Sequence, residues 1–256
     1  MKTEFVLALL FASLSGGLCQ PATNTAKAAH LQARVLLVTG IDYPGHLWRQ
    51  TAPVLAELLS QDPRLSVFTV EDPCFLDSAA INTYDVIVLH FQNWERPGPG
   101  EKARENLRRF VESGKGLVLL HYACGAWYGE WPEFTNIAGR VWGGPKVRQH
   151  DPFGPFRVEI AKTAHPISQG LVDFDTRDEL YTCLTGDHPI KVLAQAKSKV
   201  DGQYYPMAFI SNYGKGRTFH CTLGHDAQAL RVPMVQALFQ HACVWAAGLD
   251  AGTNNQ

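Results

Sequence analysis

The chain has 256 residues, of which 46% are hydrophobic, and its formal net charge is -1. This length fits one α/β domain or two small ones, and this hydrophobic content is enough to bury a core. The sequence contains no block of lysines and arginines, so nucleic acid and anionic membrane surfaces are not expected as partners.

The first residues have the pattern of a secretory signal peptide. Lys2 precedes an apolar stretch at 5–14, and small residues follow it up to Cys19. Because this stretch is too short to span a bilayer, we expect residues 1–19 to be cleaved and the protein to be secreted or periplasmic, with no integral membrane segment left. A lipoprotein anchored through Cys19 is the alternative, for which Leu18 is a poor fit. Residues 20–32 are polar and alanine-rich and predict a disordered leader before a single domain at 33–250.

The first half of that domain alternates strands and helices. Apolar runs predict strands at 34–39, 65–70, 84–89 and 117–120, and helical periodicity predicts helices at 47–60 and 101–113. The second helix has one apolar face, with Leu107, Phe110 and Val111, and Gly114 suits its C-terminal cap. This βαβαβ opening predicts an α/β fold with a doubly wound, mostly parallel sheet of the flavodoxin-like type.

The second half is richer in strands. We expect them at 156–161, 178–184, 190–196, 205–211 and 217–223, with a tight hairpin turn at 213–216 between the last two. A closing helix at 234–247 is opened by Pro233 and capped by Gly248.

Histidines follow several of the predicted strands of the parallel type. His90 and His121 come directly after apolar runs, and His46 and His225 lie a few residues beyond two others. In an open parallel sheet the carboxyl ends of the strands line one edge, where ligands bind. The sequence therefore predicts that chain-distant histidines meet at one site.

Neutral imidazoles joined by a carboxylate from Asp226, Asp151 or Glu179 can bind zinc or manganese. The metal ligands predicted in this way are His90, His121, His150 and His225. No HxH or HExxH spacing accompanies them, so hydrogen-bonded histidines without a metal are the alternative. A nucleotide cofactor is not expected, because the chain has neither a GxGxxG turn after a strand nor a phosphate-binding loop.

The segment 121–125 also resembles a nucleophile elbow, a strained turn that raises a side chain above the sheet. In that interpretation Cys124 is the nucleophile, His225 its base, and Asp226 or Glu179 the orienting group. Tyr122 stands where an elbow has glycine, and a buried, inert cysteine is the alternative. The five cysteines left after signal removal have no regular spacing and do not form a disulfide framework.

Loops at the expected edge are rich in aromatic and polar residues. Tryptophan faces beside amides, carboxylates and imidazoles suit a sugar ring, which has apolar C–H faces and a rim of hydroxyls. The alternative is that these tryptophans cover the core. The substrate-binding residues predicted on this basis are Asp42, His46, Gln92, Asn93, Trp94, Trp127, Trp131, His150, Asp151 and Tyr181.

Together these stretches resemble the ThuA-like (trehalose utilisation) family over almost everything after residue 33. The matching stretches are 84–88 (YDVIV) with His90, 116–121 (GLVLLH), 131–134 (WPEF) with Gly139, His150, 165–167 (HPI), 178–181 (DELY), and 214–217 (GKGR) leading to Gly224 and His225. The resemblance implies a fold like that of class I glutamine amidotransferases and a role in sugar catabolism, often beside oxidoreductases that make 3-keto sugars. It also implies that the amidotransferase triad is not retained.

Three functional hypotheses follow. The first is a secreted hydrolase or lyase that acts on a glycoside or 3-keto-glycoside, with a small-molecule carbohydrate as its partner and a divalent metal as a candidate cofactor. Its catalytic residues are predicted to be His121, His225, Glu179 and Asp226. The second is a cysteine-dependent amide or ester hydrolase that uses Cys124, and the third is a non-catalytic sugar-binding module. The oligomeric state is left open.

Overall fold

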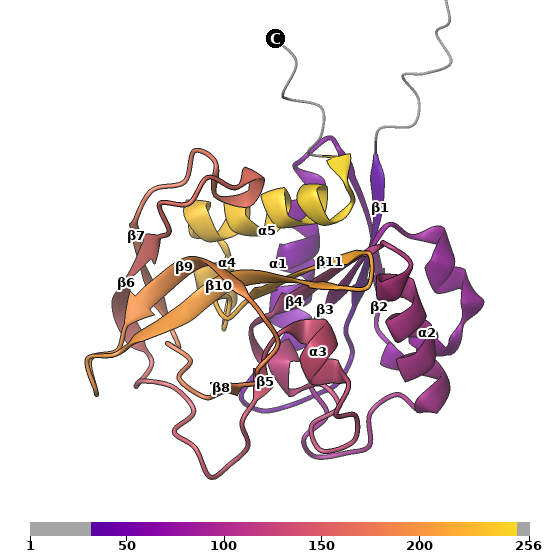
Figure 1. The fold of residues 1–256 in the computed structure, drawn as a ribbon, viewed down its shortest axis with the longest axis horizontal. Helices are drawn as coiled ribbons and strands as arrows, with labels where there is room; N and C mark the ends of the chain where they lie inside the picture. Colours follow the sequence, from indigo (N-terminus) through magenta and orange to yellow (C-terminus); the bar gives the residue numbers. More distant parts are fainter. Residues whose placement is uncertain (1–31, 250–256) are drawn as a thin grey trace, which may run out of the picture. The chain divides into compact units, whose positions relative to one another are not determined.

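The computed structural model describes residues 32–249. Its centre is one nine-stranded sheet with the order β2-β1-β3-β4-β11-β10-β9-β6-β7 (Figure 1). The first five strands in this order are parallel to one another, and β10, β9, β6 and β7 continue the sheet with antiparallel pairings. In sheet order the strands are β2 Leu65–Val70, β1 Ala33–Val38, β3 Val86–Leu89, β4 Gly116–Leu120, β11 Gly216–Cys221, β10 Tyr204–Tyr213, β9 Lys191–Lys197, β6 Gly154–Ile160 and β7 Phe174–Asp178.

Helices cover both faces of the sheet (Figure 1). One core joins the strands to α1 (Trp48–Ser60) and α5 (Pro233–Ala246), and the short α4 (Ala227–Leu230) packs against both of these helices. The opposite core contains α2 (Glu101–Glu112) and α3 (Phe134–Ala138). Every residue of β3 and β4 is buried, because both faces of these strands are covered, which explains their continuous apolar sequences.

Short elements complete the described part of the chain. A two-stranded sheet pairs β5 (Val141–Trp142) with β8 (Leu184–Thr185). The 3-10 helices are η2 Pro73–Asp77, η3 Ala79–Thr83, η4 His121–Gly125 and η5 Pro166–Ser168. Within residues 32–249 no helix has the length and apolar character needed to cross a membrane. The predicted signal peptide and all but the last residue of the predicted leader lie outside the described residues.

The doubly wound α/β arrangement predicted from the sequence is confirmed, but one predicted strand is wrong. The segment 178–184 is not a strand, since β7 ends at Asp178 and only the two residues of β8 follow in that stretch. β7 has the sequence FDTRD, in which buried and exposed residues alternate, and its polar character concealed it. The apolar run 180–183 instead lies in a loop, where Tyr181 and Cys183 pack against Cys124.

Candidate functional site

His121 lies at the point where β4 ends and η4 begins. Its φ angle is +46°, in the left-handed region that a side chain other than glycine seldom occupies, and such strain is concentrated at functional sites. Its ring is fully buried, and Nδ1 donates a hydrogen bond to the carbonyl oxygen of Thr222, 2.6 Å away. The strained position of the β4 turn thus belongs to His121 and not to Cys124.

Asp178 fixes the next two groups. Its buried carboxylate accepts hydrogen bonds from the backbone N–H groups of Glu179 (2.8 Å), Gly224 (2.7 Å) and His225 (3.3 Å). Burial raises the pKa of Asp178, although nearby His121 and these N–H donors oppose the rise. The end of β7 is therefore tied to the loop that follows β11, and the side chains of Glu179 and His225 are held beside each other.

His46 approaches from the loop between β1 and α1, where its backbone N–H closes a turn on the carbonyl of Tyr43. Its ring stacks on that of Tyr122, with centroids 4.4 Å apart and planes 15° apart. The centroids of His121 and His225 lie 5.0 and 5.2 Å from that of His46. Burial is the main cause that lowers the pKa of His46 to about 2, so its ring is neutral. Its Nδ1 is buried and has no hydrogen-bond partner among the described residues.

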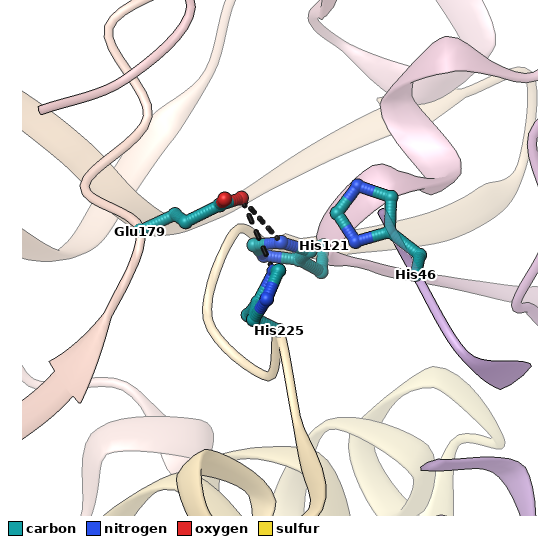
Figure 2. Close-up of side chains that lie close together, drawn as sticks. All are labelled: His46, His121, Glu179 and His225. Carbon is teal, nitrogen blue, oxygen red and sulfur yellow. Dashed lines mark hydrogen bonds and ion pairs between the residues drawn. The ribbon is translucent and has the colours of Figure 1, made fainter. Parts of the chain in front are cut away.

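These side chains converge on one point (Figure 2). His46, His121, Glu179 and His225 each offer a ligand atom, and all of these atoms lie within 4.8 Å of one another. Oε2 of Glu179 lies 3.2 Å from Nε2 of His121 and 3.3 Å from Nδ1 of His225. Zinc bonds of about 2.0–2.1 Å at tetrahedral angles separate ligand atoms by roughly 3.4 Å, so these two distances suit a small cation.

The hydrogen bond of His121 gives a second argument for a cation. The carbonyl oxygen of Thr222 only accepts hydrogen bonds, so Nδ1 of His121 carries its hydrogen and Nε2 of the neutral ring is an acceptor. That acceptor faces a carboxylate oxygen of Glu179, which is also an acceptor. Two acceptors at 3.2 Å need a proton or a metal cation between them.

The contacts between Glu179 and the histidines also set the charges of the cluster. Burial by itself raises the pKa of Glu179, but its interactions with His121 and His225 prevail and lower it well below the ordinary range. The contact with Glu179 raises the pKa of His225, against the effect of burial. Glu179 is therefore ionised, and its negative charge is balanced either by protonated histidine or by a bound cation.

His90, a predicted metal ligand, lies outside this cluster. Its Nδ1 lies 2.9 Å from Oγ1 of Thr39, its Nε2 lies 3.1 Å from Oγ1 of Thr51, and the hydroxyl of Tyr122 is 3.1 Å from each nitrogen. The ring is fully buried, and burial lowers its pKa to about 3. Because hydroxyl groups engage both nitrogens, the structure gives His90 a supporting position under Tyr122, the ring on which His46 stacks.

His150, another predicted ligand, lies at the edge of the cluster. Its Nδ1 donates to the carbonyl of Asp151 at 2.7 Å, and its Nε2 lies 3.5 Å from Oε1 of Glu179, the oxygen that does not face His121. About a third of its side chain is exposed (33%), so this ring is accessible from the pocket described next.

A pocket of about 540 Å³ opens beside the cluster. His46, His150 and Glu179 line it together with aromatic side chains. The rings of Trp94 and Trp142 form one wall, with centroids 4.6 Å apart. Tyr43 stands edge-on to Trp94 at 5.2 Å, and Tyr181 lies beside His121 at 4.5 Å. This combination of apolar faces and polar groups has the character of a site for a small polar ligand.

Several predicted substrate-binding residues lie outside this pocket. Trp127 is buried in the core that contains α2 and α3, and its Nε1 donates to the carbonyl of Pro99 at 2.8 Å. Trp131 packs against Trp127 with ring centroids 5.1 Å apart. Asn93 accepts the backbone N–H of Trp127 and donates to Glu130. These residues do not line the pocket at the cluster, although Trp127 and Trp131 line a smaller cavity with Trp142.

Two polar residues predicted to bind substrate, Gln92 and Asp151, form hydrogen bonds within the protein. Oε1 of Gln92 accepts the backbone N–H of Trp94, which fixes the loop after β3. Asp151 accepts hydrogen bonds from Ser198, Arg148 and the backbone of Lys199.

Two carboxylates of the predicted site, Asp226 and Asp42, have other positions. Asp226, a predicted catalytic residue, is the N-terminal cap of α4 and accepts the N–H groups of Gln228 and Ala229, at 2.9 and 2.8 Å. It lies outside the cluster. Asp42 accepts from Nε1 of Trp48 in a neighbouring cavity.

Some site residues were missed by the sequence analysis. His46 was assigned only to substrate binding, whereas it belongs to the candidate ligand set together with Glu179, one of the three carboxylates considered for a metal. Asp178 was given no role, and Trp142 was not among the predicted substrate-binding residues. The stretch 178–181 that carries the family resemblance includes Asp178, but only the structure shows which backbone N–H groups its carboxylate accepts.

Cys124 lies in an environment that does not suit a nucleophile. Its side chain is buried against Tyr181 and Cys183. Burial raises the pKa of its thiol well above the ordinary value, and the thiolate is the reactive form. Among the described residues, the free cysteine with exposure is Cys74, far from β4 in the sequence.

The fold is of the class I glutamine amidotransferase-like type, and a histidine–glutamate cluster lies at the edge of its sheet. The chain belongs to the ThuA family, whose model is described as trehalose utilisation and matches residues 34–246. Among curated proteins, none matches this chain.

Solved structures agree with this assignment. A ThuA-like protein from Parabacteroides merdae is 25% identical, with a TM-score of 0.74, over 84% of this chain and 90% of that one. A ThuA-like protein from Bacteroides uniformis is 19% identical, with a TM-score of 0.69, over 89% of this chain and 95% of that one. A β-galactosidase from Bacillus circulans matches 86% of this chain with 31% of its own, at 13% identity and a TM-score of 0.53. The last two likenesses show the fold alone.

Proposed function

We propose that this protein is a divalent-cation-dependent enzyme of carbohydrate breakdown that cleaves a glycoside or 3-keto-glycoside by hydrolysis or elimination. The observation that carries the proposal is the convergence of His46, His121, Glu179 and His225 within 4.8 Å, beside a pocket with aromatic walls. Imidazole and carboxylate donors suit zinc and manganese. The trehalose-utilisation description of the family supports a sugar as the substrate.

The donor set has the features of a prepared metal site. Metal-ligating histidines commonly donate their second ring N–H to a carbonyl or carboxylate, which fixes the tautomer and the ring orientation. His121 does so toward Thr222. His46 contributes a buried ring nitrogen with no partner among the described residues, and Glu179 contributes an ionised carboxylate. A bound cation would polarise a ketone oxygen or activate a water molecule.

The remaining pocket residues have separate tasks. Trp94 and Trp142 offer apolar faces on which the C–H face of a sugar ring stacks. His150 stands beside Glu179 with part of its ring exposed, so it is positioned to take a proton from the substrate or to return one to the leaving group. Removal of an acidic proton next to a ketone and protonation of a glycosidic oxygen are the transfers that elimination or hydrolysis needs.

The competing hypotheses differ in what they need from the structure. A cysteine hydrolase needs an accessible thiol of low pKa, whereas Cys124 is buried and its pKa is raised. A non-catalytic sugar-binding module needs the aromatic pocket but has no use for a set of converging metal ligands. The cluster therefore favours the metal-dependent enzyme over both.

The metal content of the purified mature protein is the first test. We expect about one zinc or manganese ion per chain by elemental analysis, and turnover of a panel of glucosides and 3-keto-glucosides that is lost on chelation and regained with the metal. His121→Ala and Glu179→Gln each remove one ligand, so we expect metal affinity to fall by more than about 100-fold, beyond the effect of losing an outer-shell partner.

His188→Ala is the matched control. This histidine lies away from the cluster, and its Nε2 donates to the carbonyl of Asn212. It should retain full metal content. Turnover that survives complete chelation, or a protein that binds no divalent cation at micromolar concentrations, would exclude the metal-dependent mechanism. Metal and sugar bound without turnover of any substrate in the panel would favour the binding module.

A further inference from the structure

A second cavity adjoins the pocket at the cluster. Its volume is about 570 Å³, and it extends over the start of α1. Three residues, Tyr43, His46 and Glu95, line both cavities. The two spaces therefore meet at His46, a member of the metal cluster, so a ligand that occupies both must pass beside the proposed reaction centre.

The second cavity differs chemically from the first. Its distinctive groups are the carboxylate of Asp42, the guanidinium of Arg49 and the side chain of Gln50. Asp42 and Arg49 form an ion pair, with 70% and 65% of their side chains exposed. Nε1 of Trp48 donates to Asp42 at 2.8 Å, and the Arg49 guanidinium lies over the Trp48 ring, 4.3 Å from its centroid. Trp48 thus orients both charged groups.

An oriented carboxylate and guanidinium match the hydroxyl groups of a sugar. The carboxylate of Asp42 accepts several hydrogen bonds and the guanidinium donates up to five, so adjacent hydroxyls, each a donor and an acceptor, can satisfy both. An apolar group in the same place would remove the pair from water without replacing its hydrogen bonds, which is unfavourable. The aromatic wall of Trp94 and Trp142 lies in the other cavity.

We propose that the second cavity is a subsite for the second ring of a two-ring sugar, held by Asp42 and Arg49, with the first ring in the aromatic pocket and the glycosidic bond beside His46. This inference rests on the proposed function and adds where the second ring would lie for a two-ring sugar, the class that the trehalose-utilisation description of the family names. Asp42 was among the substrate-binding residues predicted from the sequence, whereas no pattern in the sequence indicated its neighbour Arg49.

The test compares binding of two-ring and one-ring sugars to the full mature protein. Isothermal titration uses glucose disaccharides of different linkage, their 3-keto forms, the corresponding methyl glucosides, and aryl glucosides as two-ring ligands with an apolar second ring. We expect at least one disaccharide to bind about tenfold or more tightly than its methyl glucoside. Arg49→Ala and Asp42→Asn should each remove most of this advantage, about tenfold, and change methyl glucoside affinity by less than about threefold.

Arg231→Ala is the matched control, because Arg231 forms a similarly exposed ion pair with Glu57 at 2.8 Å and lines neither cavity. It should keep the preference for disaccharides. Equal affinities for disaccharides and methyl glucosides would overturn the second subsite and leave the proposed function standing, as would tighter binding of aryl glucosides. Absence of binding by every sugar in the panel would overturn the subsite and the carbohydrate function together.

Discussion

The parallel and antiparallel halves of the sheet contribute different chemistry to one site. In the parallel half, the segments after β1, β4 and β11 carry His46, His121 and His225. In the antiparallel half, the segment after β7 carries Glu179, the one carboxylate of the cluster. The imidazoles follow buried strands, whereas the carboxylate follows β7, the strand next to β6 at the edge of the sheet.

Asp178 joins these two halves. It is the last residue of β7, yet it accepts N–H groups from Gly224 and His225 on the other side of the site. The cluster therefore does not belong to the parallel half of the sheet alone. A doubly wound sheet without the β7 extension would bring the three histidines together without a balancing negative charge.

Loss of the hydrogen bonds of Asp178 should have the largest effect on stability and metal affinity. Asp178→Asn keeps the shape of the side chain but turns one carboxylate oxygen into an NH2 group, which cannot accept a hydrogen bond. Either the N–H of Gly224, or the N–H groups of Glu179 and His225, therefore lose their acceptor. We expect a loss of roughly 2–4 kcal/mol in the free energy of unfolding, because the hydrogen bonds of a buried charged group are lost. Metal affinity should fall about 10–100-fold, the usual cost of removing outer-shell support. Urea unfolding and competition with a chelating dye measure the two quantities.

Asp175→Asn provides the control on the same strand. Asp175 has 78% of its side chain exposed and lies 3.7 Å from Arg157, so we expect a change within about 0.5 kcal/mol and unaltered metal affinity. Equal behaviour of the two variants would mean that Glu179 and His225 hold their positions without Asp178.

The contrast between the halves also explains what the sequence could predict. Strands buried on both faces give continuous apolar runs, so β1, β3, β4 and β11 were predicted close to where they lie. Of the histidines that follow them, His46, His121 and His225 meet in the cluster and His90 does not. β7 alternates apolar and charged residues, and the apolar run after it was taken for the strand. The pattern therefore showed the site's histidines more clearly than the element that carries its carboxylate.

The direction of each ring was beyond the reach of the pattern. His90 follows β3 as directly as His121 follows β4, yet hydroxyl groups surround the ring of His90 and the strained φ of His121 turns its ring to the cluster. His46 lies several residues after β1, and its place depends on the turn with Tyr43 and on stacking over Tyr122. Such choices depend on tertiary packing, which periodicity does not encode.

The pocket wall can be altered without the cluster, which separates sugar binding from metal binding. A Cβ on Gly125 would lie 2.2 Å from Nε1 of Trp94, so Gly125→Ala must displace the indole. We expect overpacking to cost about 1–3 kcal/mol of stability and to weaken sugar binding about tenfold, with metal stoichiometry unchanged. Thermal melting, sugar titration and elemental analysis check the three expectations.

Gly154→Ala is a suitable control for that variant, because the nearest atom to its Cβ would be 3.6 Å away, an ordinary contact. Loss of metal from Gly125→Ala would show that the aromatic wall and the cluster are coupled. Unchanged sugar affinity would show that Trp94 does not contact the ligand.

The smallest effect is expected where the two halves merely pack together. Cys124, after β4, contacts Cys183 and Tyr181, which lie in the segment after β7. Cys124→Ala deletes a buried sulfur, so we expect a loss of roughly 1 kcal/mol in stability, with metal content and turnover retained. Cys243→Ala makes the same deletion in α5 and should behave alike. In the native protein a thiol reagent should modify the exposed Cys74 and spare Cys124. If Cys124→Ala alone abolished turnover while the protein stayed folded and metal-loaded, the sulfur would have a catalytic role. The imidazoles and the carboxylate of the cluster would then not be sufficient for the reaction.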